Sequence, residues 1–280
     1  DLGYLVNADR GLPYHSTWMG DIVYFDATHP GAQKFVWDRC KENYYRYGIR
    51  CFWLDEAEPE YGPYDFDNYR YYAGPALQCT NTYPVGYAKG FYEGLKAEGE
   101  KEVMSLVRCA WAGSQKYGVL TWSGDIYSSF RSMREQLQAG LSMGMAGIPW
   151  WTSDIGGFLG GQIDKPEFQE LLVRWFAWGA FCPVFRMHGE RSPWYEREEE
   201  FRNGVRQLTS GQDNEVWSFG EDNYEILKKY LFIRERLRPY VRKCMEEASN
   251  SGAPVMRPLF YEVPKDAECW NVEDSYMFGS

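Results

Sequence analysis

The fold prediction rests on the segment Trp122-Ser123-Gly124-Asp125-Ile126 and its partial repeat Trp151-Thr152-Ser153-Asp154-Ile155. In both, small residues lead from an aromatic residue to an aspartate followed by isoleucine, and each copy follows a short apolar run typical of a buried strand. An acidic side chain at the end of a buried strand is costly unless it has a partner or a function. We therefore expect Asp125 and Asp154 to face a binding site that handles a sugar.

The remaining sequence repeats the same order of strand, loop and helix. Strands are predicted at residues 21–25, 49–54, 103–107, 119–122, 146–152 and 182–187, and helices at 31–46, 87–99, 127–143, 166–179 and 222–247. The long stretch 56–84 has no clear period, which is typical of a binding loop. The polar residues that fall just after predicted strands are Asp26, Asp55, Arg108, Asp125, Asp154 and His188.

This arrangement favours one class of parallel α/β fold. In a (β/α)8 barrel the carboxyl ends of the strands form the active site, whereas a doubly wound sheet would offer a Gly-rich phosphate turn, and the sequence has none. The predicted fold class is therefore α/β, a (β/α)8 TIM barrel. Since only strands 3 to 8 are recognised, we expect the first two strands to lie upstream in a longer protein, of which this chain is a piece.

Composition limits the function. The formal charge is -10 and no Lys/Arg-rich run occurs, which argues against nucleic acid or a membrane as partner. The longest apolar stretch, residues 171–185, is interrupted by Arg174 and is too short to span a bilayer. The 12 Trp and 22 Tyr could form a large aromatic core, or they could line a cleft in which flat rings bind sugars.

The cysteine and histidine patterns favour a cytoplasmic protein without a metal or other cofactor. The seven cysteines are odd in number and widely spaced, as expected of reduced thiols rather than disulfides or a zinc site. The histidines His15, His29 and His188 do not cluster, and no Asp-rich calcium loop of the D-x-D-x-D-G kind is present. Oligomeric state is not readable from the sequence.

The run Asp55-Glu56-Ala57-Glu58-Pro59-Glu60 could be a solvated acidic turn, but its first acid directly ends the apolar run 51–54. We therefore expect Asp55 to point into the cleft, with Glu58 orienting it or binding a hydroxyl. Asp55 and Asp125 would be the two carboxylates that glycoside hydrolysis needs, about 5–5.5 Å apart in a retaining enzyme. Trp122 could supply the apolar wall that keeps the acid protonated.

Two further polar residues and one competing motif bear on the prediction. Arg108 could hold a carboxylate or donate to sugar hydroxyls, and His188 could hydrogen-bond a hydroxyl, although a lone histidine is more often structural. The segment Gly140-Leu141-Ser142-Met143-Gly144 matches the G-x-S-x-G elbow of serine hydrolases. That elbow needs a strand before the serine and a helix after it, and the predicted order here is the reverse.

Taken together, the chain resembles glycoside hydrolase family 31, the retaining α-glycosidases that include α-glucosidases and α-xylosidases. The resemblance is carried by Trp53-Leu54-Asp55-Glu56-Ala57-Glu58-Pro59-Glu60, Trp122-Ser123-Gly124-Asp125, Gly147-Ile148-Pro149-Trp150-Trp151-Thr152-Ser153-Asp154-Ile155-Gly156-Gly157-Phe158, Arg186-Met187-His188 and Pro254-Val255-Met256-Arg257-Pro258-Leu259-Phe260.

The resemblance implies roles for individual residues. Asp55 would be the nucleophile that forms a covalent glycosyl-enzyme, and Asp125 the general acid and then the base. The residues that would hydrogen-bond the first sugar are Arg108, Asp154 and His188, and those that would line its pocket are Trp53, Trp122 and Phe158. No cofactor is implied. Residues 1–260 would form the partial barrel, and residues 261–280 would begin a C-terminal β-domain or linker.

The predicted function is exo-acting hydrolysis of a terminal α-xyloside or α-glucoside in an oligosaccharide or other α-glycoside. The order Trp-Leu-Asp-Glu-Ala-Glu-Pro-Glu resembles bacterial members assigned to α-xylosidase activity. Two alternatives remain open at this point. One is an α-transglycosylase that uses the same residues, and the other is a non-catalytic carbohydrate-binding barrel.

Overall fold

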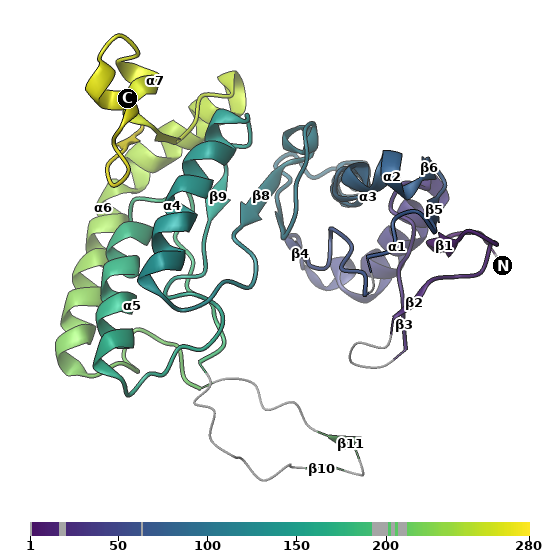
Figure 1. The fold of residues 1–280 in the computed structure, drawn as a ribbon, viewed down its shortest axis with the longest axis horizontal. Helices are drawn as coiled ribbons and strands as arrows, with labels where there is room; N and C mark the ends of the chain where they lie inside the picture. Colours follow the sequence, from purple (N-terminus) through teal and green to yellow (C-terminus); the bar gives the residue numbers. More distant parts are fainter. Residues whose placement is uncertain (1, 17–20, 63, 192–200, 203–204, 207–211) are drawn as a thin grey trace. The chain divides into compact units, whose positions relative to one another are not determined.

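The computed structural model describes residues 2–16, 21–62, 64–191, 201–202, 205–206 and 212–280 (Figure 1). The chain forms two compact units, Asp1–Thr121 and Trp122–Ser280. In the described part of the chain, no helix is long and apolar enough to cross a membrane.

A parallel sheet lies at the centre of the first unit. Strand β4 (Phe52–Leu54) pairs in parallel with β7 (Ser105–Val107), which pairs in parallel with β8 (Val119–Trp122). In the register of this sheet, Leu54 lies opposite Val107 and Val107 opposite Thr121, and all three are buried. The carboxyl ends of these strands therefore meet at one edge, as the barrel prediction requires.

Helices α1 (Pro30–Asn43) and α3 (Tyr83–Ala97) pack together in this unit (Figure 1). The close approach depends on Gly94, because a Cβ atom there would overlap the buried ring of Trp37. The Trp37 ring also meets Phe91 and Phe52 edge-on, at centroid distances of 6.0 and 5.9 Å. This cluster joins both helices to strand β4 and so fixes the strand that carries Asp55.

A tyrosine-rich cluster supports the loop after β4. Strands β1 (Asn7–Ala8), β5 (Tyr69–Tyr71) and β6 (Gly74–Pro75) form a small antiparallel sheet, followed by α2 (Ala76–Cys79) and the short helix η2 (Thr80–Thr82). The prediction of an irregular loop over 56–84 was therefore incomplete, because its buried tyrosines form a core of their own: Tyr61, Tyr69, Tyr71 and Tyr83.

The predicted parallel strand at 21–25 is wrong. Strand β3 (Ile22–Val23) instead pairs antiparallel with β2 (His15–Ser16). Asp26, which follows it, is buried, and its carboxylate accepts hydrogen bonds from Thr28 N, Thr28 Oγ1 and Tyr72 N. Asp26 thus ties two backbone segments together and does not face a cleft.

The second unit is built on helices. These are α4 (Phe130–Met145), α5 (Pro166–Gly179) and α6 (Glu221–Ser251), with strand β9 (Trp151–Thr152) and the hairpin of β10 (Phe201–Arg202) and β11 (Val205–Arg206). Helices α5 and α6 pack against each other around the fully buried Leu172, Trp175 and Leu227. Within this core Trp175 Nε1 donates to Ser153 Oγ at 2.9 Å, which anchors the segment before Asp154.

The predicted strand at 182–187 is also wrong, since these residues form no strand. Two hydrogen bonds join the segment to β9, from Val184 N to Trp151 O and from Thr152 Oγ1 to Val184 O. Pro183 has no N–H to donate. The guanidinium of Arg234 on α6 takes the carbonyl oxygens of residues 180, 182 and 183 at 2.7–2.9 Å, which a sheet ladder would otherwise use.

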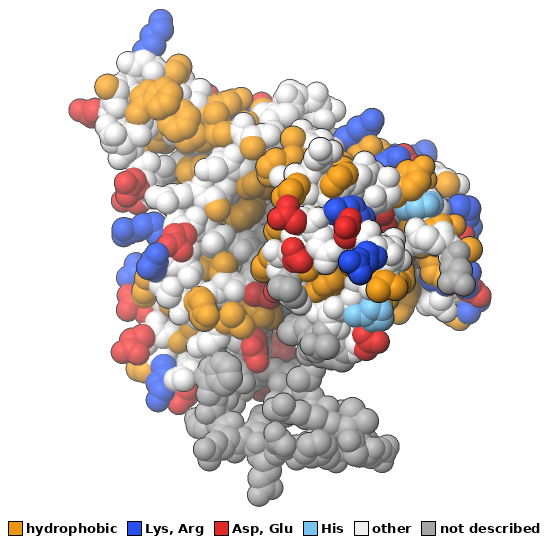
Figure 2. All heavy atoms as spheres, turned by 45° about the vertical axis from the view of Figure 1, so that its right-hand side comes forward, with side chains coloured by type: hydrophobic (Ala, Val, Ile, Leu, Met, Phe, Trp, Pro, Cys, Tyr) orange, Lys and Arg blue, Asp and Glu red, His pale blue; other side chains and the backbone are white. Residues whose placement is uncertain are grey.

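The C-terminal residues form a small hairpin. Strand β12 (Met256–Arg257) pairs antiparallel with β13 (Met277–Phe278), and α7 (Leu259–Glu262) and η4 (Ala267–Trp270) lie between them. Hydrophobic side chains gather at the end of the second unit where α7 lies (Figure 2, upper left), and Val263 and Trp270 are exposed there.

Candidate active site

Asp55 and Arg108 occupy neighbouring positions at the carboxyl edge of the parallel sheet. Asp55 follows β4 and Arg108 follows β7, and Arg108 N donates to Leu54 O at 3.3 Å. Arg108 Nη1 lies 3.6 Å from Asp55 Oδ1, and the same oxygen accepts a hydrogen bond of 3.0 Å from Glu56 N. The Asp55 side chain is 48% exposed and is thus accessible to a ligand. Arg108 therefore pairs with the Asp55 carboxylate, while its role toward a sugar stays a prediction.

The Arg108 guanidinium is shared by an acidic cluster, defined here as Asp55, Glu56, Glu58 and Glu60. Its Nε lies 2.8 Å from Glu58 Oε1, its Nη1 lies 3.2 Å from Glu56 Oε1, and its Nη2 pairs with Glu60 Oε2. Burial alone would lower the pKa of Arg108, but Glu58, Glu60 and Glu56 outweigh it and raise that pKa. The run of acids is therefore a bound cluster and not a solvated turn.

Burial, together with the neighbouring negative charges, changes the protonation of this cluster. Burial raises the pKa of Glu56 to about 7, because lost hydration and the neighbouring carboxylates outweigh the attraction of Arg108. Burial likewise raises the pKa of Glu58. Glu56 also has a left-handed backbone with φ of 52°, a strained conformation that costs about 1–3 kcal/mol. This turn directs Glu56 N back onto Asp55.

The tyrosine-rich core positions the far end of the cluster. Tyr24, itself buried, donates its hydroxyl to Glu60 O at 2.5 Å. Tyr14 donates to Gly62 O at 3.1 Å, and Gly62 N donates back to Tyr14 Oη at 2.9 Å. The loop after β4 is thus fixed at Glu60 and at Gly62. Trp53, on the strand itself, is 47% exposed.

In the second unit, the loops that carry Asp125 and Asp154 lie side by side. Phe158 N and Leu159 N both donate to Ile126 O, at 2.8 and 2.9 Å, and Ser128 N donates to Leu159 O at 2.9 Å. Gly157 has φ of +82°, and a Cβ atom there would approach Ser128 Cα to 2.6 Å. The two related sequence segments therefore form one joined pair of loops, with Asp125 exposed.

Asp154 is fully buried, and Arg186 Nη1 pairs with its Oδ1. The Arg186 guanidinium also lies 5.9 Å from the ring centroid of Trp122, which is itself buried. A fully buried carboxylate needs such a charged partner. Arg186 was part of a motif used for the resemblance, but no role was predicted for it.

Phe158 and His188 form a stacked pair. Their ring centroids lie 5.5 Å apart at an interplanar angle of 25°, and both residues are partly exposed. The structure thus shows two groups, in which Arg186 joins Trp122 to Asp154 and Phe158 stacks on His188. The predicted grouping of these residues around one site is consistent with this arrangement, while their contact with a sugar stays a prediction.

Arg191 joins the Asp154 loop to the segment that carries His188, and the sequence analysis did not single it out. It is fully buried, and its guanidinium donates to Gly157 O at 2.7 Å, Ile155 O at 2.6 Å and His188 O at 3.3 Å. Burial lowers its pKa to about 10, partly offset by Asp154. One side chain therefore sets the positions of both the Asp154 loop and the His188 segment.

The pairing of Asp55 with Asp125 lies across the two units and stays a prediction. Within the described residues, no group of three or more His, Cys, Asp or Glu side chains could hold a metal ion. The contacts that the structure does give are a fixed, accessible carboxylate in the first unit and a buried Asp–Arg pair beside stacked aromatic rings in the second.

Comparison with known proteins identifies both parts of the chain. Residues 1–243 match the model of the glycosyl hydrolases family 31 TIM-barrel domain, and residues 252–280 match that of the family 31 C-terminal domain. The first match confirms the predicted barrel class. The predicted boundary at residue 260 is not tested by these ranges.

Among curated proteins, an uncharacterized family 31 glucosidase of Pseudescherichia vulneris is 65% identical over 191 residues, covering 68% of this chain and 36% of that protein. An α-xylosidase of Saccharolobus solfataricus is 32% identical over 257 residues, covering 86% of this chain and 32% of that one. The chain thus spans about a third of the length of these relatives.

Solved structures give the same picture. A family 31 α-xylosidase from a soil metagenome, complexed with xylose, superposes with a TM-score of 0.94 at 60% identity, covering 99% of this chain and 41% of that one. The dextranase of Flavobacterium johnsoniae, complexed with glucose, superposes with a TM-score of 0.85 at 29% identity, covering 100% of this chain and 33% of that one.

Proposed function

The chain belongs to glycoside hydrolase family 31, and we propose that the protein is a retaining α-glycosidase that removes a terminal α-linked sugar. The observation that carries the proposal is the contact between Arg108 Nη1 and Asp55 Oδ1 at 3.6 Å. It fixes an exposed carboxylate at the carboxyl edge of the parallel sheet, where barrel enzymes carry out their chemistry.

The reaction proceeds in two displacements. Asp55 attacks the anomeric carbon while the bond to the leaving oxygen breaks and Asp125 gives that oxygen its proton. Asp125 then removes a proton from water, and the resulting hydroxyl displaces Asp55 from the same carbon. Two inversions at one carbon retain its configuration, so the released sugar is the α-anomer.

The second unit would bind the hydroxyl groups of the reacting sugar. The Asp154–Arg186 pair offers both an acceptor and a donor, and His188 adds a ring nitrogen beside the flat face of Phe158. Arg191 keeps these groups in place through the backbone, which is the rigid support that a catalytic geometry needs.

An α-xyloside is the first choice of substrate. The support is the 60% identity to an α-xylosidase complexed with xylose, which exceeds the 29% identity to the dextranase complexed with glucose. An α-glucoside is the second choice, because a protein described as a family 31 glucosidase is 65% identical.

The experiment that tests this proposal is a substrate panel with the full-length protein. p-Nitrophenyl α-xyloside, α-glucoside, α-galactoside and α-N-acetylgalactosaminide are offered to the wild type, to Asp55→Asn and to Asp38→Asn. Asp38 is a matched control, since it is paired to Lys34 on helix α1. We expect the wild type and Asp38→Asn to hydrolyse the xyloside and Asp55→Asn to lose this activity. NMR should detect the α-anomer as the first product. Near-normal hydrolysis by Asp55→Asn would show that Asp55 is not the nucleophile.

A further inference from the structure

Two carboxylates compete for one nitrogen of the Arg108 guanidinium. Nη1 lies 3.2 Å from Glu56 Oε1 and 3.6 Å from Asp55 Oδ1. The shorter contact is a hydrogen bond, whereas the longer one lies beyond hydrogen-bond distance. Glu56 therefore takes the donor that the proposed nucleophile also needs, and the chemistry described so far gives Glu56 no part.

The other two nitrogens of Arg108 contact different carboxylates. Nε lies 2.8 Å from Glu58 Oε1, and Nη2 pairs with Glu60 Oε2. These contacts restrain the guanidinium, so that Nη1 can approach one of its two acceptors only by moving away from the other. A change of charge on Glu56 is therefore transmitted to Asp55 through Nη1.

Glu56 is placed to hold a proton near neutral pH. Its Oε2 is buried, and no described residue donates a hydrogen bond to that oxygen. Burial raises the pKa of Glu56 to about 7, and Glu60, Glu58 and Asp55 raise it further against the attraction of Arg108. A protonated carboxyl group tolerates such a site better than a carboxylate does, since the carboxylate needs donors for both oxygens.

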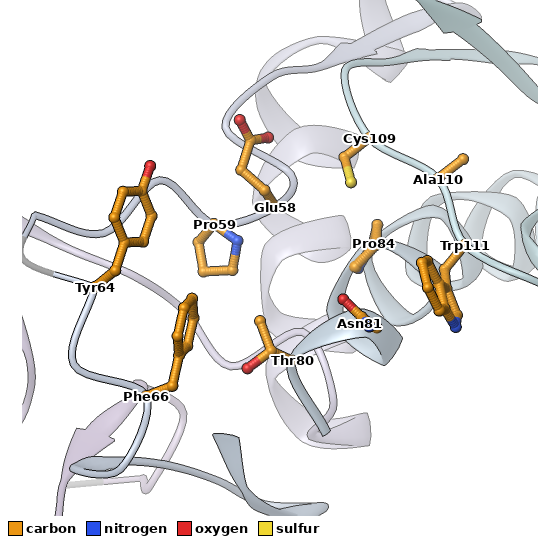
Figure 3. Close-up of a pocket in the computed structure, with 10 residues that line it drawn as sticks. All are labelled: Glu58, Pro59, Tyr64, Phe66, Thr80, Asn81, Pro84, Cys109, Ala110 and Trp111. Atoms are coloured by element: carbon orange, nitrogen blue, oxygen red, sulfur yellow. The ribbon is translucent and has the colours of Figure 1, made fainter. Parts of the chain in front are cut away.

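Two phenols and a thiol beside the acidic cluster stay neutral in this pH range. Burial raises the pKa of Tyr24, and it raises that of Tyr87 on helix α3 to about 12. Cys109 lines the same pocket as Glu58 (Figure 3), and burial raises the pKa of its thiol to about 11. Burial also raises the pKa of Glu58, so its titration has to be separated from that of Glu56 by experiment.

We propose that Glu56 is a positioning residue for Asp55: with its proton it leaves Arg108 Nη1 to Asp55, and without the proton it draws Nη1 away. The proposal rests on the proposed glycosidase activity. When Glu56 is neutral, Nη1 and Glu56 N both act on Asp55 Oδ1. When Glu56 is ionised, the half-exposed Asp55 side chain loses the first of these donors. Activity then falls at alkaline pH for a reason that does not involve the proposed proton donor, Asp125.

α-Xylosyl fluoride separates the two causes of alkaline loss in the full-length protein. A fluoride ion leaves with little need of a proton, so the ionisation of Asp125 hardly affects kcat/KM for this substrate. In the wild type this kcat/KM should fall about tenfold from about pH 6 to about pH 9, because a small displacement of a catalytic group costs that much. In Glu56→Gln, which is neutral at every pH, it should fall less than about twofold over the same range.

Two variants are controls, and all proteins are assayed well below their melting temperatures. Glu58→Gln removes the acid that contacts Nε, and it should keep the alkaline fall whatever its activity at lower pH. Glu93→Gln, at an exposed acid that pairs with Lys89 on helix α3, should behave like the wild type. The proposal is overturned if the wild type shows no alkaline fall on the fluoride, if Glu56→Gln keeps it, or if Glu58→Gln loses it.

Crystal structures of the wild type at about pH 5 and about pH 9 give a second test that does not depend on turnover. Nη1 should lie within hydrogen-bond distance of Asp55 Oδ1 at the lower pH and nearer to Glu56 at the higher pH. Equal distances at the two pH values would overturn the proposal as well. If the wild type hydrolyses neither the fluoride nor any glycoside of the panel, the proposed function fails, and the two crystal structures alone decide whether Glu56 directs Arg108.

Discussion

Arg108 Nη1 lies 3.6 Å from Asp55 Oδ1, and the same guanidinium contacts Glu56, Glu58 and Glu60. One planar group thus fixes four carboxylates that would otherwise repel one another. The planar fork of arginine can serve several acceptors at once, whereas a lysine ammonium acts as a single point charge.

Arg108→Lys should therefore lower kcat/KM about 100-fold, since a displacement of about 1 Å at a catalytic group can cost that much. It should also lower the melting temperature, because part of the acidic cluster loses its counter-charge. Steady-state kinetics and thermal unfolding measure the two effects. Arg50→Lys, which alters a surface pair with Glu100 in the same unit, is the control. Kinetics like those of the control would show that Arg108 does not position Asp55.

Glu56 should give the stability of the protein a defined pH dependence. Burial raises the pKa of Glu56 from 4.5 to about 7. The folded protein then keeps a proton that the unfolded chain loses, so this contribution to stability is fully present below pH 4.5 and is lost as pH rises through about 7. Glu56→Gln, neutral at every pH, should melt like the wild type near pH 4.5 and at a higher temperature at pH 8.

Melting curves at both pH values test the Glu56 prediction. The comparison is with Glu135→Gln, which removes one negative charge from an exposed pair with Arg131 on α4. An equal shift at both pH values in Glu56→Gln would mean that Glu56 does not titrate in this range.

Most of the helices were predictable because their signals are local. Helix α5 has the bounds predicted, 166–179, and the parallel strands β4, β7 and β8 lie within predicted strands. The strand predicted at 182–187 does not form for two reasons. Pro183 interrupts the apolar run, and Arg234, about fifty residues away, donates hydrogen bonds to carbonyl groups at its start. Hydrogen bonds from so distant a helix leave no trace in the run itself.

The candidate acids and Arg108 stand out in the sequence, whereas Arg191 does not. Asp55, Asp125 and Asp154 stand out because each follows an apolar run. Arg191 lies in a polar segment rich in Arg and Glu, and its complete burial depends on Gly157 and Ile155, which are more than thirty residues away. Arg186, by contrast, was visible as the first residue of Arg186-Met187-His188, and the buried Asp154 supplies the reason for a cation there.

Arg191→Lys should destabilise the protein by about 3 kcal/mol. A lysine cannot reach the carbonyl groups of Ile155, Gly157 and His188 together, and each buried group left without a partner costs about 1–3 kcal/mol. Urea unfolding followed by tryptophan fluorescence measures the change. Arg174→Lys on helix α5, where the arginine is 66% exposed and pairs with Glu170, is the control. If the free energy of unfolding of Arg191→Lys lies within 0.5 kcal/mol of that control, the three backbone hydrogen bonds of Arg191 do not stabilise the fold as predicted.

Asp125→Ala should discriminate between leaving groups. General acid catalysis contributes about 10²–10⁴-fold, and a fluoride ion leaves with far less need of a proton than a sugar hydroxyl does. We expect kcat/KM for xylosyl-α-1,6-glucose to fall by that factor and the value for α-xylosyl fluoride to fall much less. Added azide, which needs no base to attack, should raise turnover of the fluoride and yield an α-xylosyl azide. Asp164→Ala, at an exposed aspartate of the same unit that pairs with Lys165, should leave both substrates unaffected. Equal losses on the two substrates, without rescue by azide, would remove Asp125 from the acid–base role and leave Asp55 without its predicted partner.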